Sequence, residues 1–169
     1  MYKIINNIYV GPVSTVLFAK ECGFSILGCC KYPLHQQNAR LTGASRDGYL
    51  KIPKTEPEYY YAERDHALYC NLIDADDMKY IPDVIIERAL KFIADEISDG
   101  RKVLAVCNNG VSRSPSIALM YLIREGYFDS SYTFDEVLKI FRKKYPIYQP
   151  NKGMYDYTKQ FFEKYLEKR

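Results

Sequence analysis

Two residue types suited to phosphate chemistry, a cysteine and an arginine, frame a five-residue segment in the second half of the chain. Cys107 offers a thiol, which is a strong nucleophile once it is ionised. Arg113 offers a guanidinium, whose paired donors match two phosphoryl oxygens. The residues between them, which we expect to bind phosphate, are Asn108, Asn109, Gly110, Val111 and Ser112. The spacing predicts a loop in which Cys107 attacks a phosphate that Arg113 holds.

The residues on either side predict where this loop lies. Residues 103–106 form an apolar run that is typical of a short buried strand. Residues 114–122 are typical of a helix, with Ser114 as its N-cap and Pro115 at its first helical position. The loop would therefore lie at a helix N-terminus, where backbone N–H groups and the helix dipole attract an anion and favour the thiolate form of Cys107.

This arrangement resembles the active-site loop of the cysteine-based protein tyrosine phosphatases, and more narrowly their compact dual-specificity branch. The resemblance extends to residues 7–11, similar to the opening strand of the family, to 71–74, similar to its general-acid loop, and to 145–154, similar to its closing helix and turn. One departure is Val106, which stands where the family usually has a histidine before the cysteine. The resemblance therefore implies weaker or different support for the thiolate.

The resemblance implies roles for further side chains. Asp74 follows an apolar run at the place where the family carries its general acid, and Asp76 and Asp77 remain alternatives for that role. The hydroxyl of Ser114 would help the thiolate to leave during the second step of hydrolysis, a role compatible with capping the helix. Asn151 would hold the loops of the site in place through side-chain hydrogen bonds.

The length of 169 residues and the hydrophobic fraction of 47% predict one α/β domain with a single core. Strands are predicted at 4–10, 24–30, 67–73 and 103–106, and helices at 12–22, 82–98, 114–122, 133–144 and 153–166. This alternation predicts a central, mostly parallel (mixed) sheet flanked by helices on both faces, with the ligand at the carboxyl ends of the strands. We expect residues 1–169 to form a single catalytic domain of the dual-specificity type.

Residues 31–64 form the longest stretch predicted to be irregular. Their composition shifts to proline, glycine, glutamine, asparagine and charged residues. Long loops in compact domains often carry recognition surfaces, and a flexible insertion is the alternative.

Composition argues against several classes of protein. The net charge is +3, from 24 Lys and Arg against 21 Asp and Glu, so a nucleic-acid partner is not expected. No apolar stretch is long enough to span a membrane, and residues 1–7 lack the pattern of a signal peptide, so we expect a soluble cytoplasmic protein. The five cysteines lack zinc-type spacing and are odd in number, which argues against a disulfide framework. No metal or cofactor is expected, and a monomer is expected with the oligomeric state left open.

The sequence favours a metal-free, two-step phosphomonoester hydrolase acting on phosphoproteins. Phosphatases of RNA 5′-phosphates or phosphoinositides are alternatives, but polyanionic ligands favour a basic loop and residues 108–112 are uncharged. A non-catalytic pseudophosphatase that binds phosphate is a further alternative, although it would usually lack the cysteine, the arginine or the acid. The choice between phosphotyrosine and phosphoserine or phosphothreonine stays open.

The remaining thiols suggest a second kind of chemistry. Cys29 and Cys30 end a predicted strand, and the resemblance to the phosphatase family implies that this strand lies beside the strand leading to Cys107. One of them could trap an oxidised Cys107 as a disulfide. The alternative is that both are small core residues.

Overall fold

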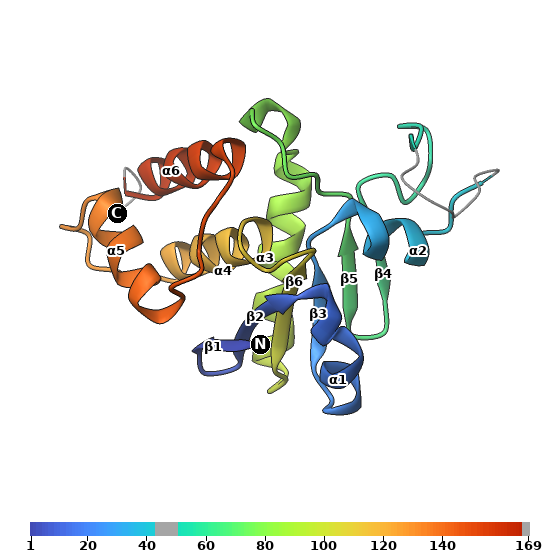
Figure 1. Ribbon diagram of the computed structural model, residues 1–169, viewed down its shortest axis with the longest axis horizontal. Coiled ribbons are helices and arrows are strands. Elements are labelled where there is room, and N and C mark those ends of the chain that lie inside the picture. The colour runs from blue at the N-terminus through green and yellow to red at the C-terminus, as the bar shows by residue number, and fades with distance from the viewer. Residues whose placement is uncertain (43–50, 167–169) are drawn as a thin grey trace.

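A computed structural model describes residues 1–42 and 51–166 of the chain, which form a mixed six-stranded sheet with helices on both faces (Figure 1). The strand order is β1-β2-β6-β3-β5-β4. The strands are β1 (Tyr2–Ile5), β2 (Ile8–Pro12), β3 (Ser25–Gly28), β4 (Tyr61–Arg64), β5 (Ala67–Cys70) and β6 (Val103–Cys107). The four inner strands run parallel and the two edge strands antiparallel, which confirms the predicted fold class.

The central strand β6 positions the phosphate-loop segment. All five of its residues are buried, as expected for a parallel strand covered on both faces. It pairs with β2 in a register that places Pro12 opposite Cys107, and with β3 in a register that places Gly28 opposite Val106. The carboxyl ends of three parallel strands therefore meet around Cys107.

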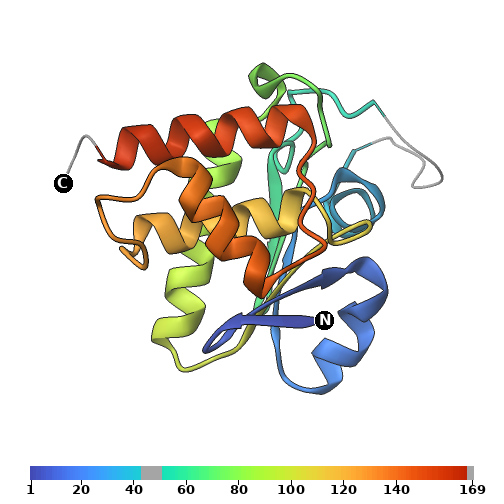
Figure 2. The same ribbon diagram turned by 60° about the vertical axis from the view of Figure 1, so that its left-hand side comes forward.

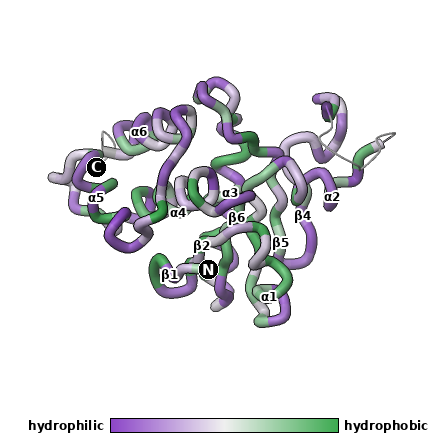
Figure 3. Tube along the Cα trace, in the orientation of Figure 1, coloured by the Kyte–Doolittle hydropathy of each residue, from purple (hydrophilic) through white to green (hydrophobic). Residues whose placement is uncertain are grey.

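The two faces of the sheet are covered unequally, by one short helix on one face and by four longer helices on the other (Figure 2). Figure 2 shows α1 (Val16–Glu21) on one side of the sheet and the longer helices on the other. These are α3 (Asp83–Ser98), α4 (Arg113–Arg124), α5 (Phe134–Lys144) and α6 (Lys152–Leu166). Every residue of α4 from Arg113 to Ile123 is buried, because α4 lies between the sheet and α6. In Figure 3 the hydrophobic residues gather around the sheet and the hydrophilic ones in the outer loops.

Several predicted boundaries are confirmed. The first predicted strand, 4–10, is a hairpin of β1 and β2 around Asn7, which has a φ of +67°. Helix α3 covers all but the first residue of the predicted range. Helix α5 begins with a capping box, in which the Thr133 hydroxyl accepts a bond from the Glu136 N–H and the Glu136 carboxylate accepts one from the Thr133 N–H.

Several boundaries were predicted wrongly. The predicted helix over 12–22 is a short turn η1 (Val13–Thr15) followed by α1, and the predicted strand over 24–30 is β3, which is shorter at both ends. Strand β5 ends at Cys70 rather than at residue 73, because the chain turns there and the Leu72 N–H bonds back to the Cys70 carbonyl. Helix α4 begins at Arg113 with Ser112 at the N-cap, so Ser114 is not the N-cap and lies in the first turn. The hydroxyl of Ser114 is directed to the Cys107 sulfur instead of to a backbone N–H.

The segment 31–64 has more regular structure than predicted. It contains a helical turn η2 (Lys31–His35), a single turn α2 (Gln36–Asn38) and the edge strand β4. Strand β4 was missed because it is half-exposed and lies in a charged, tyrosine-rich stretch without clear alternation. The part of the segment from 43 to 50 lies outside the described residues.

Candidate active site

The turn from Asn108 to Ser112 joins β6 to α4 and is shaped by Gly110. This glycine has a φ of +72°, which other residues rarely adopt. A Cβ atom there would lie 2.7 Å from the carbonyl carbon of Gly11 in β2. Both the backbone angle and the close approach of the neighbouring strand therefore require glycine.

Groups behind the turn hold its carbonyl oxygens. The Tyr145 hydroxyl donates to the Gly110 carbonyl at 2.7 Å, and the Gln149 N–H donates to the Val111 carbonyl at 2.9 Å. Burial raises the pKa of Tyr145 to about 12, so its hydroxyl keeps its proton at neutral pH. In the described part of the chain the N–H groups of residues 109–112 donate to no protein group, so these donors are available to an anion.

Cys107 lies at the bottom of the turn and is nearly fully buried. The Ser114 hydroxyl donates to its sulfur at 3.3 Å. The preceding residue Val106 is completely buried in the sheet, so its side chain offers no polar support from that position.

Arg113 is held by two acceptors, and its Nε has no hydrogen-bond partner. Its Nη1 donates to the Leu72 carbonyl at 3.1 Å and its Nη2 to the Asn108 side-chain oxygen at 2.6 Å. Its Nε is buried without a hydrogen-bond partner and lies 3.7 Å from a carboxylate oxygen of Asp74. Buried donors are usually satisfied, so an unsatisfied one at this place is consistent with an anion-binding site.

Asp74 is the acidic residue that the structure brings to the loop. Its Oδ1 accepts a hydrogen bond from the Ser112 hydroxyl at 2.7 Å. Asn151 joins the same group, because its side-chain amide donates to the Asp74 carbonyl at 3.0 Å and its N–H donates to the Ser112 hydroxyl oxygen at 3.0 Å. The Ser112 hydroxyl therefore connects the loop of Asp74, the phosphate-loop turn and the segment before α6.

The two alternative acids are placed differently. Asp77 is the N-cap of the short turn η3 (Met78–Tyr80), where it accepts a bond from the Lys79 N–H and pairs with the Lys79 ammonium at 2.8 Å. This ammonium lowers the pKa of Asp77. Asp76 is exposed. Among the described residues neither forms a hydrogen bond or ion pair with Cys107 or Arg113, whereas Asp74 approaches Arg113 directly.

The first turn of α6 supports the loop that carries Asp74. The Gly153 N–H donates to the Ala75 carbonyl at 3.2 Å. A Cβ atom at Gly153 would collide with the same carbonyl oxygen. Sequence reasoning used residues 145–154 only as a resemblance and missed the contacts of Tyr145 and Gly153, because nothing local indicates which distant loop they touch.

Other chemistries find no support in the described residues. They contain no group of three or more His, Cys, Asp or Glu side chains that could hold a metal ion. Within the same ranges no helix is long and apolar enough to span a membrane. His35 is buried, with its Nε2 2.7 Å from the Glu58 carbonyl, and His66 lies near Glu96, so both histidines have partners other than Cys107.

The fold and the Cys107–Arg113 loop define a class, the cysteine-based protein tyrosine phosphatases. Residues 42–164 match the family "Dual specificity phosphatase, catalytic domain". The chain belongs to this family.

Individual relatives agree with this assignment. The chain is 31% identical over 76 residues to the candidate tyrosine phosphatase 123R of invertebrate iridescent virus 6, a match that covers 45% of this chain. The chain spans about half, 51%, of the length of that relative. Human tyrosine phosphatase-like serine/threonine/tyrosine-interacting protein has a similar fold, with a TM-score of 0.63, 19% identity and coverage of 98% of this chain and 97% of its own. Human DUSP28 aligns over 100% of both chains, with a TM-score of 0.65 and 13% identity.

Proposed function

We propose that this protein is an active, cysteine-dependent phosphomonoesterase that removes phosphate from phosphoproteins. One observation carries the proposal: the Cys107 thiol, the Arg113 Nε, which has no hydrogen-bond partner, and the Asp74 carboxylate surround a turn whose N–H groups are available. Each group supplies one requirement of phosphoryl transfer, namely a nucleophile, charge stabilisation and a proton donor.

In the first step the Cys107 thiolate attacks phosphorus. The S–P bond forms while the ester P–O bond breaks, and charge grows on the equatorial oxygens. Arg113 and the N–H groups of the turn stabilise that charge. Asp74, in its protonated form, gives its proton to the leaving oxygen.

In the second step water releases the phosphate. The Asp74 carboxylate accepts a proton from water while the water oxygen attacks phosphorus and the S–P bond breaks. The thiolate is the leaving group, and the Ser114 hydroxyl, 3.3 Å from the sulfur, stabilises it by donating a hydrogen bond. The products are inorganic phosphate and the free thiolate.

The uncharged side chains of the turn favour a phosphoprotein substrate over a polyanionic one. Asn108, Asn109 and Val111 add no positive charge to that of Arg113. The Asn108 amide also contacts the Tyr32 carbonyl at 3.0 Å, which supports a role for the segment 31–64 at the substrate side of a single domain, 1–169. The cytoplasmic location and monomeric state inferred from composition stay predictions.

Replacing the nucleophile tests this function, with an exposed thiol as the control. We expect Cys107→Ser to lose nearly all hydrolysis of a phosphotyrosine peptide in the presence of a metal chelator, because an alcohol is far less ionised than a thiol. Cys22→Ser, at an exposed cysteine on the far end of α1, should keep wild-type activity. Equal activity in both variants, or an inactive wild type that still binds phosphate analogues, would rule out the proposed enzyme. A parallel panel of phosphoserine peptide, phosphoinositide and 5′-triphosphorylated RNA would identify the substrate class.

A further inference from the structure

The side chain of Asn108 bridges the arginine of the site and the backbone of a different segment. Its Oδ1 accepts a hydrogen bond from Arg113 Nη2 at 2.6 Å, and its Nδ2 donates to the Tyr32 carbonyl at 3.0 Å. A side-chain amide has one acceptor, its oxygen, and donors on its nitrogen. Because the Asn108 nitrogen donates to the Tyr32 carbonyl, the Asn108 oxygen is held facing the guanidinium.

The hydrogen bond to Asn108 restricts the orientation of the Arg113 guanidinium, the group that binds phosphate in the proposed mechanism. A guanidinium has five N–H donors in a fixed plane. The Leu72 carbonyl takes a donor on Nη1 and Asn108 takes one on Nη2, which leaves the Nε donor and one further donor on each of Nη1 and Nη2. Two acceptors on different nitrogens fix the plane, so the remaining donors need no reorganisation when phosphate binds.

The neutrality of the amide is important for the same reason. A carboxylate at position 108 could also accept a bond from Arg113, but it would offset the positive charge and repel a phosphate dianion. An apolar side chain would leave the charge intact and release the guanidinium. Asparagine fixes Arg113 without neutralising it.

We propose that Asn108 is a positioning residue that aligns Arg113 for phosphate binding and transition-state stabilisation, through the bridge from Tyr32 to the guanidinium. The inference rests on the proposed function and assigns to the Asn108 side chain a role beyond that of a general member of the phosphate-binding turn. It predicts that loss of the amide weakens oxyanion binding and catalysis together, because Arg113 contacts the phosphoryl group in both states.

The first test compares loss of the Asn108 amide with loss of an asparagine amide outside the site. Asn108→Leu should lower kcat/KM for p-nitrophenyl phosphate by about tenfold or more, and raise the Kd for tungstate by a similar factor, because a hydrogen bond to a charged group is lost. The control is Asn6→Leu, which removes an exposed amide in the turn between β1 and β2, outside the segments that form the site. The control should stay within about twofold of the wild type.

The second test reads the arginine directly and separates positioning from general disruption. In the ¹⁵N spectrum the Arg113 Nε–H signal, assigned by its absence in Arg113→Lys, should be sharp in the wild type and broadened or averaged in Asn108→Leu. Asn108→Asp keeps an acceptor for Arg113 but cannot donate to the Tyr32 carbonyl, so its Nε–H signal should be broader than in the wild type and sharper than in Asn108→Leu, while tungstate affinity falls through charge repulsion.

An Asn108→Leu protein with wild-type tungstate affinity overturns the inference, and so does one with an unchanged Arg113 signal. These results leave the proposed function standing if the wild type hydrolyses substrate. An inactive wild type that binds no tungstate contradicts the function instead, and the Nε–H signals still decide whether Asn108 orders Arg113.

Discussion

The hydroxyl of Ser112 shows how single residues connect the parts of the site. It donates to the Asp74 carboxylate and accepts from the Asn151 N–H, so its donor and acceptor functions are both in use. We infer that it holds Asp74 at the turn before substrate arrives.

The choice among the three acids can be tested at neutral pH. Asp74→Asn should lower kcat by roughly 10²-fold and flatten the alkaline limb of the pH–rate profile, because a general acid is removed. Asp77→Asn should change little. The Asp77 carboxylate caps η3 and pairs with the Lys79 ammonium, whereas the Asp74 carboxylate lies 3.7 Å from Arg113 Nε. If the alkaline limb is flattened in Asp77→Asn or Asp76→Asn and unchanged in Asp74→Asn, the general acid is Asp77 or Asp76 and not Asp74.

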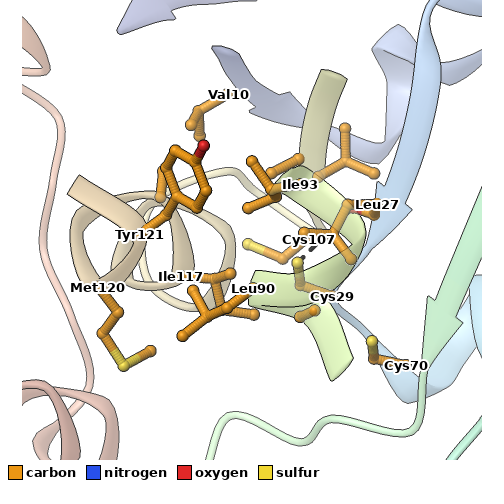
Figure 4. Packing of buried hydrophobic residues seen from close by; sticks show 14 of the residues in the cluster. Val10, Leu27, Cys29, Cys70, Leu90, Ile93, Cys107, Ile117, Met120 and Tyr121 are labelled. Atoms are coloured by element: carbon orange, nitrogen blue, oxygen red, sulfur yellow. Dashed lines mark hydrogen bonds between the residues drawn. The ribbon is translucent and has the colours of Figure 1, made fainter. Parts of the chain in front are cut away.

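Cys29 lies beside the nucleophile, and this predicts a response to oxidation. Its N–H donates to the Val106 carbonyl at 2.7 Å, which continues the β3–β6 ladder to the level of Cys107 (Figure 4). Burial raises the pKa of the Cys29 thiol well above its ordinary value, so Cys29 remains protonated while Cys107 reacts with peroxide. Condensation of the Cys107 sulfenic acid with the Cys29 thiol would form a disulfide and release water.

Non-reducing peptide mapping after mild peroxide treatment checks this expectation. A peptide pair joining Cys29 to Cys107, absent in Cys29→Ser, should appear, and reducing agent should restore activity. Oxidation of Cys107 only to sulfinic or sulfonic acid, with no link to Cys29 or to Cys30, would leave both as packing residues.

At the scale of elements, the site depends on where strands end and helices begin. The chain between Cys70 and Asp74 is a loop, and the first turn of α6 holds this loop in place through Gly153. The acid is therefore positioned by a helix that follows it by almost eighty residues.

Gly153→Ala should separate catalysis from helix stability. Alanine in place of glycine normally stabilises a helix by about 0.5–1 kcal/mol, but here the added Cβ meets the Ala75 carbonyl and must displace the acid loop. We expect kcat to fall about tenfold or more, because misplacement of a catalytic group is costly, while the far-UV circular dichroism spectrum is unchanged. Lys159→Ala, at an exposed position of α6, is the control. A Gly153→Ala enzyme with wild-type kcat would show that the contact does not position Asp74.

The sequence predicted elements whose signals are local and missed those that depend on distant contacts. The apolar run before Cys107 and the capping box at Thr133 indicated β6 and α5 because burial and capping have short-range patterns. The same reasoning placed the N-cap at Ser114, since serine before proline favours a helix start, whereas the hydroxyl bonds to the Cys107 sulfur. The bridge from Asn108 to Tyr32 spans 76 residues, and no local pattern indicates it.

At the scale of the whole molecule, the reactive loop is embedded in the hydrophobic core. Cys107 belongs to the buried cluster that also contains Leu27 of β3, Leu90 of α3 and Ile117 of α4 (Figure 4). Helix α4, which carries Arg113 and Ser114, is enclosed on all sides by the sheet and α6. A close-packed interior of this kind limits movement of the two ends of the loop, so the core fixes the distance between nucleophile and guanidinium.

The proposed mechanism passes through a covalent phosphocysteine, and rapid acid quenching followed by peptide mass mapping detects this intermediate. Asp74→Asn should accumulate the intermediate from p-nitrophenyl phosphate, because the good leaving group makes the first step independent of the acid while the second step lacks its base. We expect phosphate on the peptide that contains Cys107 in Asp74→Asn, and no phosphate on that peptide in the Asp74→Asn, Cys107→Ser double variant. Hydrolysis by the wild type with no phosphate on Cys107 in the quenched Asp74→Asn enzyme, or with phosphate on another residue, would contradict the proposed mechanism.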